Sequence, residues 1–145
     1  MQEILFKGKL KDSQSKNQWV TGYYCKLSST TYAFKEDYEK FPITYKHFIV
    51  TDEMTDWGLP NKFAFHEIEP ESLGQYIGWM TPYEKIYTGD ILRNIIDGKT
   101  YKVVWDDYDG YFFEALDKSC NAFFDDFTYE DNVLLTAEII GNVND

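Results

Sequence analysis

The chain has 145 residues, of which 43% are hydrophobic, enough for one ordinary domain or for two small lobes that share a core. Its formal net charge is −11 at pH 7, and most of the excess lies in residues 101–145, which contain 2 basic and 11 acidic side chains. Because a C-terminal third of that charge repels phosphate backbones, direct binding to DNA or RNA is not expected.

The first residues and the cysteines indicate the compartment. The chain opens with Met1-Gln2-Glu3, and no long apolar run follows, so no secretory signal is predicted. No window approaches the roughly 18 apolar residues that a membrane span needs. Cys25 and Cys120 each stand among aromatic and small residues, which is typical of buried free thiols. These features predict a protein of a reducing cytoplasm that makes no membrane contact.

The first predicted elements are two strands. Residues 3–9 alternate in strand fashion, and residues 19–27 are rich in aromatic and β-branched side chains, so the two predict an opening hairpin. Residues 28–45 allow two interpretations. They contain either a short helix over 34–41, which Pro42 would end, or an insertion loop.

Two further strands precede a predicted boundary. Residues 47–51 are an apolar strand, and residues 61–68 alternate in strand fashion. Glu69-Pro70 then predicts a turn, because proline interrupts a strand and favours chain reversal. We therefore predict an N-terminal antiparallel β region over residues 1–69 and a C-terminal lobe over residues 70–145.

Short strands and turns are predicted throughout the C-terminal lobe. The strands are expected at residues 76–77, 91–96, 101–105, 111–116 and 133–143, with one helical turn at 121–127. Asp97-Gly98-Lys99 and Asp107-Tyr108-Asp109-Gly110 are predicted to be tight hairpin turns. Strands of this length, with turns every 8–12 residues, favour a small antiparallel barrel or roll. The fold class predicted for the whole chain is mainly β with little helix.

Three sequence blocks, in order, span nearly the whole chain. They are Glu3–Lys9 with Trp19-Val20 and Gly22-Tyr23-Tyr24; then Pro70-Glu71, Gly74-Gln75-Tyr76, Gly78, Ile86-Tyr87 and Gly89-Asp90-Ile91; then Val103–Asp106 and Glu138–Val143. Together they resemble the YopX-like family of phage and prophage proteins. The middle departs from the family pattern, since Lys26 to Asn61 is longer and more aromatic, and Thr81–Lys85 stands where the family has a charged turn. The resemblance implies an SH3-like barrel for the C-terminal lobe and a bacterial host cell, but no molecular function.

No residue pattern predicts a catalytic, metal or cofactor site. Asp106–Gly110 fails as a calcium loop, because placing Gly110 at the sixth position puts Trp105 at the first and Leu116 at the twelfth. The two cysteines and two histidines stand as singletons rather than in the close pairs typical of zinc ligands. We therefore expect no enzymatic activity, no metal and no cofactor.

Loop aromatics and acidic residues are the candidate partner-binding residues. The aromatic residues in predicted loops or turns are Trp57, Trp79, Tyr83 and Tyr108. The acidic candidates are Asp106, Asp107, Asp109, Asp125 and Asp126. Such aromatics either form a protein contact or pack locally, and such acids either form a solvated face or meet a basic partner.

These observations predict a non-enzymatic protein-interaction module in the bacterial cytoplasm, which binds a host or phage protein and forms a homo-oligomer. The alternative is a nucleic-acid-linked role, in which the acidic face mimics DNA and occupies a basic host protein. A third hypothesis, a hydrolase or a small-molecule binder, depends only on the paired carboxylates.

Overall fold

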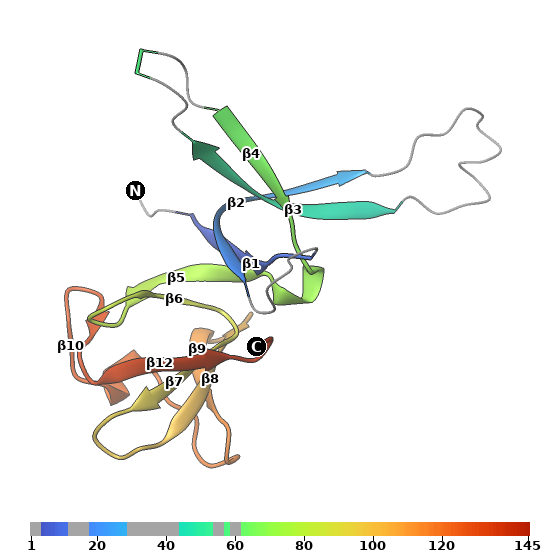
Figure 1. Cartoon of the computed structure of the whole chain (residues 1–145). Helices are drawn as coiled ribbons and strands as arrows, with labels where there is room; N and C mark the ends of the chain where they lie inside the picture. The colour runs from blue at the N-terminus through green and yellow to red at the C-terminus, as the bar shows by residue number, and fades with distance from the viewer. Residues whose placement is uncertain (1–3, 12–17, 29–43, 54–56, 59–61) are drawn as a thin grey trace. The chain divides into compact units, whose positions relative to one another are not determined.

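Strands dominate the computed structural model, which describes residues 4–11, 18–28, 44–53, 57–58 and 62–145 (Figure 1). The described residues contain no α-helix, only the 3-10 turns η1 (Pro70–Ser72) and η2 (Phe124–Asp126). The prediction of a mainly β protein is therefore confirmed. The two interpretations of residues 28–45 fall mostly on residues 29–43, which lie outside the described residues.

The chain forms two compact units, Leu5–Leu73 and Gly74–Asp145, and Ile4 groups with the second. In the first, four antiparallel strands follow one another in sequence order: β1 (Phe6–Lys9), β2 (Trp19–Ser28), β3 (Tyr45–Glu53) and β4 (Lys62–Glu67). The pairing of β1 with β2 confirms the predicted opening hairpin.

Strand β2 pairs with both β1 and β3, and Gly22 lies where the two pairings meet. Residues up to Gly22 pair with β1, and residues from Tyr23 onward pair with β3. A Cβ atom at Gly22 would lie 2.4 Å from the carbonyl oxygen of Val50, so only glycine permits this close approach. Ile49, from β3, is fully buried on the same side of the sheet as Gly22.

The last residues of the first unit form hydrogen bonds with the end of its first strand, β1. Leu10 and Ile68 form an antiparallel bridge, and the Glu69 N–H donates to the Lys9 carbonyl at 2.9 Å. Ser72 Oγ accepts a 2.7 Å hydrogen bond from the Lys9 N–H. Because these contacts bind the Glu69–Ser72 turn to β1, the division between the units falls after Leu73, shortly beyond the predicted boundary at Glu69-Pro70.

The second unit contains two groups of strands. The first group comprises β5 (Gly74–Met80), β6 (Lys85–Tyr87), β10 (Tyr129–Glu130) and β11 (Val133–Leu134). The second is an antiparallel sheet in the order β12 (Ala137–Asn142), β7 (Asp90–Asn94), β8 (Thr100–Asp106) and β9 (Gly110–Ala115). The order of strands ends at β12 and at β9, and beyond β9 there is only an isolated bridge between Phe113 and Ala122, so the described strands of this sheet do not close into a barrel.

Side chains from both groups form one core. Ile77 and Ile86 from the first group pack with Leu92, Val103 and Phe113 from the second, and each is at most 3% exposed. Phe113 also makes edge contacts with the rings of Phe124 and Phe127. Burial of this apolar surface is the main stabilising term of the unit.

A buried carboxylate joins the start of β7 to the end of β12. Asp90 is fully buried, and its carboxylate accepts hydrogen bonds from the Tyr87 N–H at 2.8 Å and from Asn142 Nδ2 at 2.9 Å. Gly89 has φ of +89° and bonds through its N–H to the Val103 carbonyl. The Gly89-Asp90 and Gly141-Asn142 blocks, far apart in sequence, therefore meet in one structural network.

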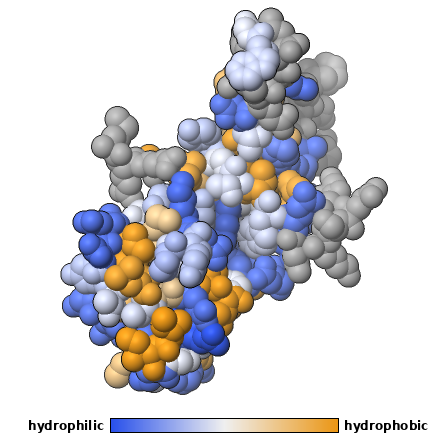
Figure 2. Space-filling model, turned by 60° about the vertical axis from the view of Figure 1, so that its left-hand side comes forward, coloured by the Kyte–Doolittle hydropathy of each residue, from blue (hydrophilic) through white to orange (hydrophobic). Residues whose placement is uncertain are grey.

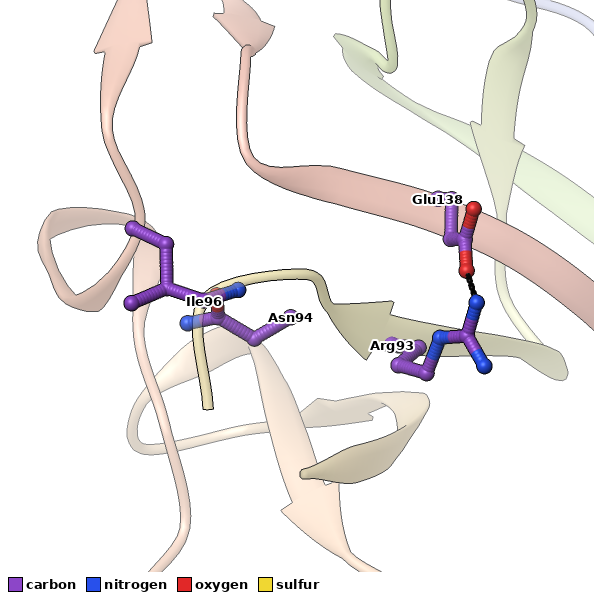
Figure 3. A network of polar contacts seen from close by, with 4 residues as sticks. All are labelled: Arg93, Asn94, Ile96 and Glu138. Atoms are coloured by element: carbon purple, nitrogen blue, oxygen red, sulfur yellow. Dashed lines mark hydrogen bonds and ion pairs between the residues drawn. The ribbon is translucent and has the colours of Figure 1, made fainter. Parts of the chain in front are cut away.

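The β7–β8 connection confirms the predicted hairpin. The Ile96 N–H donates to Asn94 Oδ1 at 3.0 Å, which tightens the turn, and Figure 3 shows both residues at the end of β7. Arg93 and Glu138 form a cross-strand ion pair between β7 and β12 in the same view. Side chains at the tip of the turn reach solvent, since Ile96 is 73% exposed.

Two predicted elements differ from the structure. Residues 133–143 were predicted to be one strand, but Leu135-Thr136 turn the chain and separate β11 from β12. The turn allows β11 to run parallel to β5 and β12 to join β7. Trp79 was predicted to lie in a loop, and this is also wrong, because it lies within β5.

Candidate functional site

Three of the four predicted surface aromatics are exposed, and they lie in different turns. Trp57, Tyr83 and Tyr108 are 87%, 92% and 99% exposed. Trp57 belongs to the first unit, Tyr83 to the turn between β5 and β6, and Tyr108 to the turn between β8 and β9. They therefore form no common cluster in the second unit.

Trp79 packs within the second unit. Its ring stacks on Phe124 with a centroid distance of 4.5 Å and contacts the edge of Tyr129 at 5.5 Å. It is half-buried and lies against the hydrophobic core. The Trp79 ring is therefore used in packing within the second unit.

Some of the predicted acidic residues accept hydrogen bonds within turns, and the others are exposed to solvent. The Asp106 carboxylate accepts the Tyr108 N–H at 2.6 Å, and the Asp126 carboxylate accepts the Phe123 N–H at 2.8 Å. Asp107 accepts a 3.3 Å bond from the Trp105 indole N–H. Asp109 and Asp125 are exposed. The β8–β9 turn therefore presents acidic side chains beside an exposed indole.

That indole belongs to a groove of about 490 Å³ in the second unit, lined by Gln75, Thr88, Trp105 and Tyr111. Trp105 is 58% exposed and meets the Tyr111 ring edge-on, with centroids 4.7 Å apart. Hydrophobic residues reach the surface in patches among hydrophilic ones (Figure 2). The groove has two aromatic walls, an amide and a hydroxyl.

Strand alternation explains why the groove lies at the rim of the core. Tyr101, Val103 and Trp105 point to the same side of β8, and the first two are buried. Trp105 pairs directly with Tyr111 of β9. The core-facing side of the β8–β9 hairpin therefore extends past the buried core into solvent and presents two aromatic rings there.

Backbone and side-chain bonds hold the polar wall. The Thr88 N–H donates to the Gln75 carbonyl at 2.9 Å, and the Gln75 N–H donates to Thr88 Oγ1 at 3.0 Å. The bond from Trp105 Nε1 to Asp107 orients the indole. Desolvation raises the pKa of the Tyr111 hydroxyl, so this group is neutral near pH 7.

The lining of the groove is aromatic and uncharged. Aromatic faces, a neutral hydroxyl and an amide are typical of surfaces that bind an extended peptide. The lining residues include no carboxylate, histidine or cysteine. Across the described residues, no group of three or more histidine, cysteine and acidic side chains is placed to hold a metal ion.

The histidines and cysteines lie apart. His47 Nδ1 is 2.5 Å from Tyr24 Oη, and His66 Nε2 is 3.0 Å from Thr51 Oγ1. Strand register places Cys25 on the opposite face of the sheet from both histidines. Cys120 is exposed, so its predicted burial is wrong, and it belongs to the second unit.

Sequence reasoning missed Trp105 and Tyr111 as site residues. Both stand in strands with regular alternation, which predicts burial rather than exposure. The available signal was position: each is next to the β8–β9 turn, where a core-facing side chain can extend beyond the core.

Searches against protein-family models, curated proteins and solved structures returned no match. The YopX-like resemblance therefore depends on the sequence blocks alone. In the part of the chain that the structure describes, no helix has the length and apolarity to cross a membrane.

Proposed function

We propose that the chain is a non-enzymatic protein-interaction module whose second unit binds a short, positively charged segment of a partner protein. The observation that carries the proposal is the groove in which the exposed Trp105 and the half-buried Tyr111 lie beside the acidic β8–β9 turn. Aromatic side chains bind apolar and proline-containing segments, and neighbouring carboxylates favour lysine or arginine.

The sequence resemblance supplies the context of this proposal. A YopX-like protein would act in the cytoplasm of a bacterial host, and its partner would be a host or phage protein. We also infer an SH3-like roll for the second unit, which the packing of two strand groups around one core supports. Binding grooves lined by aromatic side chains are frequent in such small β domains.

A peptide library tests the groove. Short immobilised peptides of matched apolar content carry positive, neutral or negative charge, and binding of the purified chain is measured for each. Only the positively charged set is expected to bind. Trp105→Ala should weaken binding at least tenfold, because a central tryptophan often contributes about 2 kcal/mol or more to an interface.

Trp57→Ala is the matched control, since it removes the same side chain from an exposed turn of the first unit. Unchanged binding by Trp105→Ala, with loss by Trp57→Ala, would move the site to that turn and contradict the proposal. Equal binding to all three peptide sets would contradict the role of charge.

The second candidate function is DNA mimicry, favoured by the charge of the second unit. Residues 74–145 contain 5 basic and 14 acidic side chains, hence a net charge of −9. Affinity capture from bacterial lysate, with nuclease, separates the two candidates. Substitution of Asp106, Asp107, Asp109, Asp125 and Asp126 by asparagine would abolish capture of a basic DNA-binding protein under mimicry, whereas Trp105→Ala would leave it intact.

A further inference from the structure

Strand β4 is the outer strand of the first unit's sheet, and part of its outer edge is unpaired among the residues that the structure describes. The Ile68 N–H donates to the His47 carbonyl at 2.9 Å, on the side of β3, whereas the Glu67 carbonyl accepts from the Lys11 N–H at 3.1 Å, on the other side. Backbone groups of successive residues in a strand point to alternate sides. Phe63 and Phe65 are four and two residues from Glu67, so their backbone N–H and C=O groups point to the same side as those of Glu67, away from β3.

Apart from the contacts of Leu10 and Lys11 with Ile68 and Glu67, no strand of the described part of this unit pairs with that side of β4, which ends the order β1-β2-β3-β4 (Figure 1). The side chains there are apolar and exposed, Phe63 to 68% and Phe65 to 57%. Phe65 meets the ring of Phe48 edge-on, with centroids 6.1 Å apart. An open, apolar edge of this kind is a template for pairing with another strand.

Charge points to a second copy as the occupant. Residues 5–73 contain 9 basic and 10 acidic side chains, whereas residues 74–145 contain 5 and 14. Two copies therefore repel each other through their second units and least through their first units. Within β4, Lys62 is the one basic residue and Glu67 the one acidic residue, and Glu67 already pairs with Lys11 Nζ at 3.5 Å, so antiparallel pairing of two copies brings no like charges together.

We propose that two copies of the chain pair antiparallel along β4, about a two-fold axis beside Ala64. Such an axis is perpendicular to the sheet, so each face of one copy continues into the same face of the other. Paired residues must therefore point to the same face, which means that they are separated by an even number of positions in the sequence. A register centred on Phe65 would require the Glu67 carbonyl, which already accepts from Lys11. The register centred on Ala64 uses only the outward groups of Phe63 and Phe65.

This register forms reciprocal hydrogen bonds between Phe63 of one copy and Phe65 of the other, twice by symmetry. Their rings become cross-strand neighbours on the exposed face, which stabilises antiparallel pairs. Lys62 opposes His66 of the second copy. The sheet thus continues from one copy into the next. The pairing goes beyond the proposed groove and holds whether or not that groove binds a peptide.

The first test measures the mass of the chain in solution by sedimentation over a range of concentrations, with no peptide present. Twice the chain mass of 17.1 kDa is expected at high concentration. Phe65→Lys should weaken dimerisation at least tenfold, because a charged side chain at the edge opposes pairing. Tyr23→Lys is the control: it changes an exposed aromatic of the same face on β2, two strands from the edge.

A monomer at every concentration would overturn the proposal. Equal loss of dimer in Phe65→Lys and Tyr23→Lys would also overturn it, because it would indicate face-to-face packing of the two sheets. Polydisperse large species would indicate aggregation through the edge instead of a closed pair.

The second test determines the register by disulfide formation in a chain with Cys25→Ser and Cys120→Ser. Ala64 opposes itself across the proposed axis as a non-hydrogen-bonded pair, with a Cα separation of ~4.5 Å, within reach of a disulfide. Ala64→Cys should form a covalent dimer on mild oxidation. Lys62→Cys, which opposes His66 and not itself, should not. The reverse result would exclude this register.

Discussion

Residues of the same type have different environments in the second unit. Trp105 is exposed beside Tyr111, although Tyr101 and Val103 on the same side of its strand are buried. Asp106 caps a surface turn, whereas Asp90 lies fully buried among backbone and amide donors. Position relative to the edge of the core decides each outcome.

Removing the buried carboxylate should destabilise the second unit. Asp90→Ala leaves the Tyr87 N–H and the Asn142 amide without the acceptor that each now uses. We expect a loss of about 3 kcal/mol in the free energy of unfolding, since each unsatisfied buried group costs about 1–3 kcal/mol. Chemical denaturation measures it. Asp125→Ala, at an exposed site, should change stability by less than about 0.5 kcal/mol.

A double-mutant cycle with Asn142→Ala checks the cause. Asp90 and Asn142 are in contact, so their combined effect should fall short of the sum of the single effects. Additive effects would show that the hydrogen bond between them contributes nothing.

A buried tyrosine predicts loss of stability at high pH. Desolvation, with smaller contributions from Asp97, Asp126 and Asp117, raises the pKa of Tyr101 above its ordinary value of 10.0. The protonated form is therefore favoured in the folded state, so this contribution is complete below pH 10.0 and is lost as the pH rises through the raised pKa.

Thermal unfolding of Tyr101→Phe against pH tests this prediction. The variant should lose less stability than the wild type between neutral pH and the region above pH 10.0. Tyr108→Phe removes the hydroxyl of a side chain that is 99% exposed, and its profile should follow the wild type. Identical profiles for all three proteins would contradict the role of Tyr101.

At the scale of elements, glycine positions and turns decide which strands pair. Gly22 lets β2 turn from β1 to β3, and the turn at Leu135-Thr136 lets β11 and β12 join different groups. Strand propensity in both regions predicts continuous strands. The break at Leu135-Thr136 sends β11 and β12 to different neighbours, whereas Gly22 lies inside the continuous strand β2 and permits the close approach of β3 there.

Gly22→Ala tests the first of these positions. The added Cβ would lie 2.4 Å from the Val50 carbonyl oxygen and 3.1 Å from Ile49 Cγ2, and backbone cannot move aside as a flexible side chain can. We expect destabilisation of about 1–3 kcal/mol from overpacking, measured by denaturant unfolding.

Gly141→Ala is the control for Gly22→Ala. Its Cβ would lie 3.3 Å from the Asp145 carboxylate, a side chain that can shift by a few tenths of an ångström and keep its hydrogen bond from the Asn142 N–H. A loss at Gly141 equal to that at Gly22 would show that close backbone approach is not the cause.

At the scale of the whole molecule, charge is divided between the two units. The first is close to neutral, and the second carries a net charge of −9 over residues 74–145. Self-repulsion in the second unit lowers its stability at low ionic strength. The same division leaves the first unit as the surface where copies approach most easily.

Added salt should therefore stabilise the protein. The unfolding temperature is expected to rise from low ionic strength to well above the physiological ~0.15 M, because screening reduces repulsion among exposed carboxylates. A variant with Asp107, Asp109 and Asp125 replaced by asparagine should show a smaller rise. An equal rise in both proteins would show that salt acts by strengthening the burial of apolar surface and not by screening these carboxylates.

Local sequence alone determined the mainly β class, the opening hairpin and the hairpin turn after Asn94, because alternation and turn residues act over a few positions. It also showed the acidic C-terminal third. Only the tertiary structure decided that Trp79 packs while Trp105 is exposed, and that Asp90 meets Asn142. It also decided that Lys11 bonds to Glu67, and that no described strand pairs with the outer side of β4 at Phe63 and Phe65. These outcomes depend on where the core ends and which distant strands meet, and neither is encoded in a local pattern of residues.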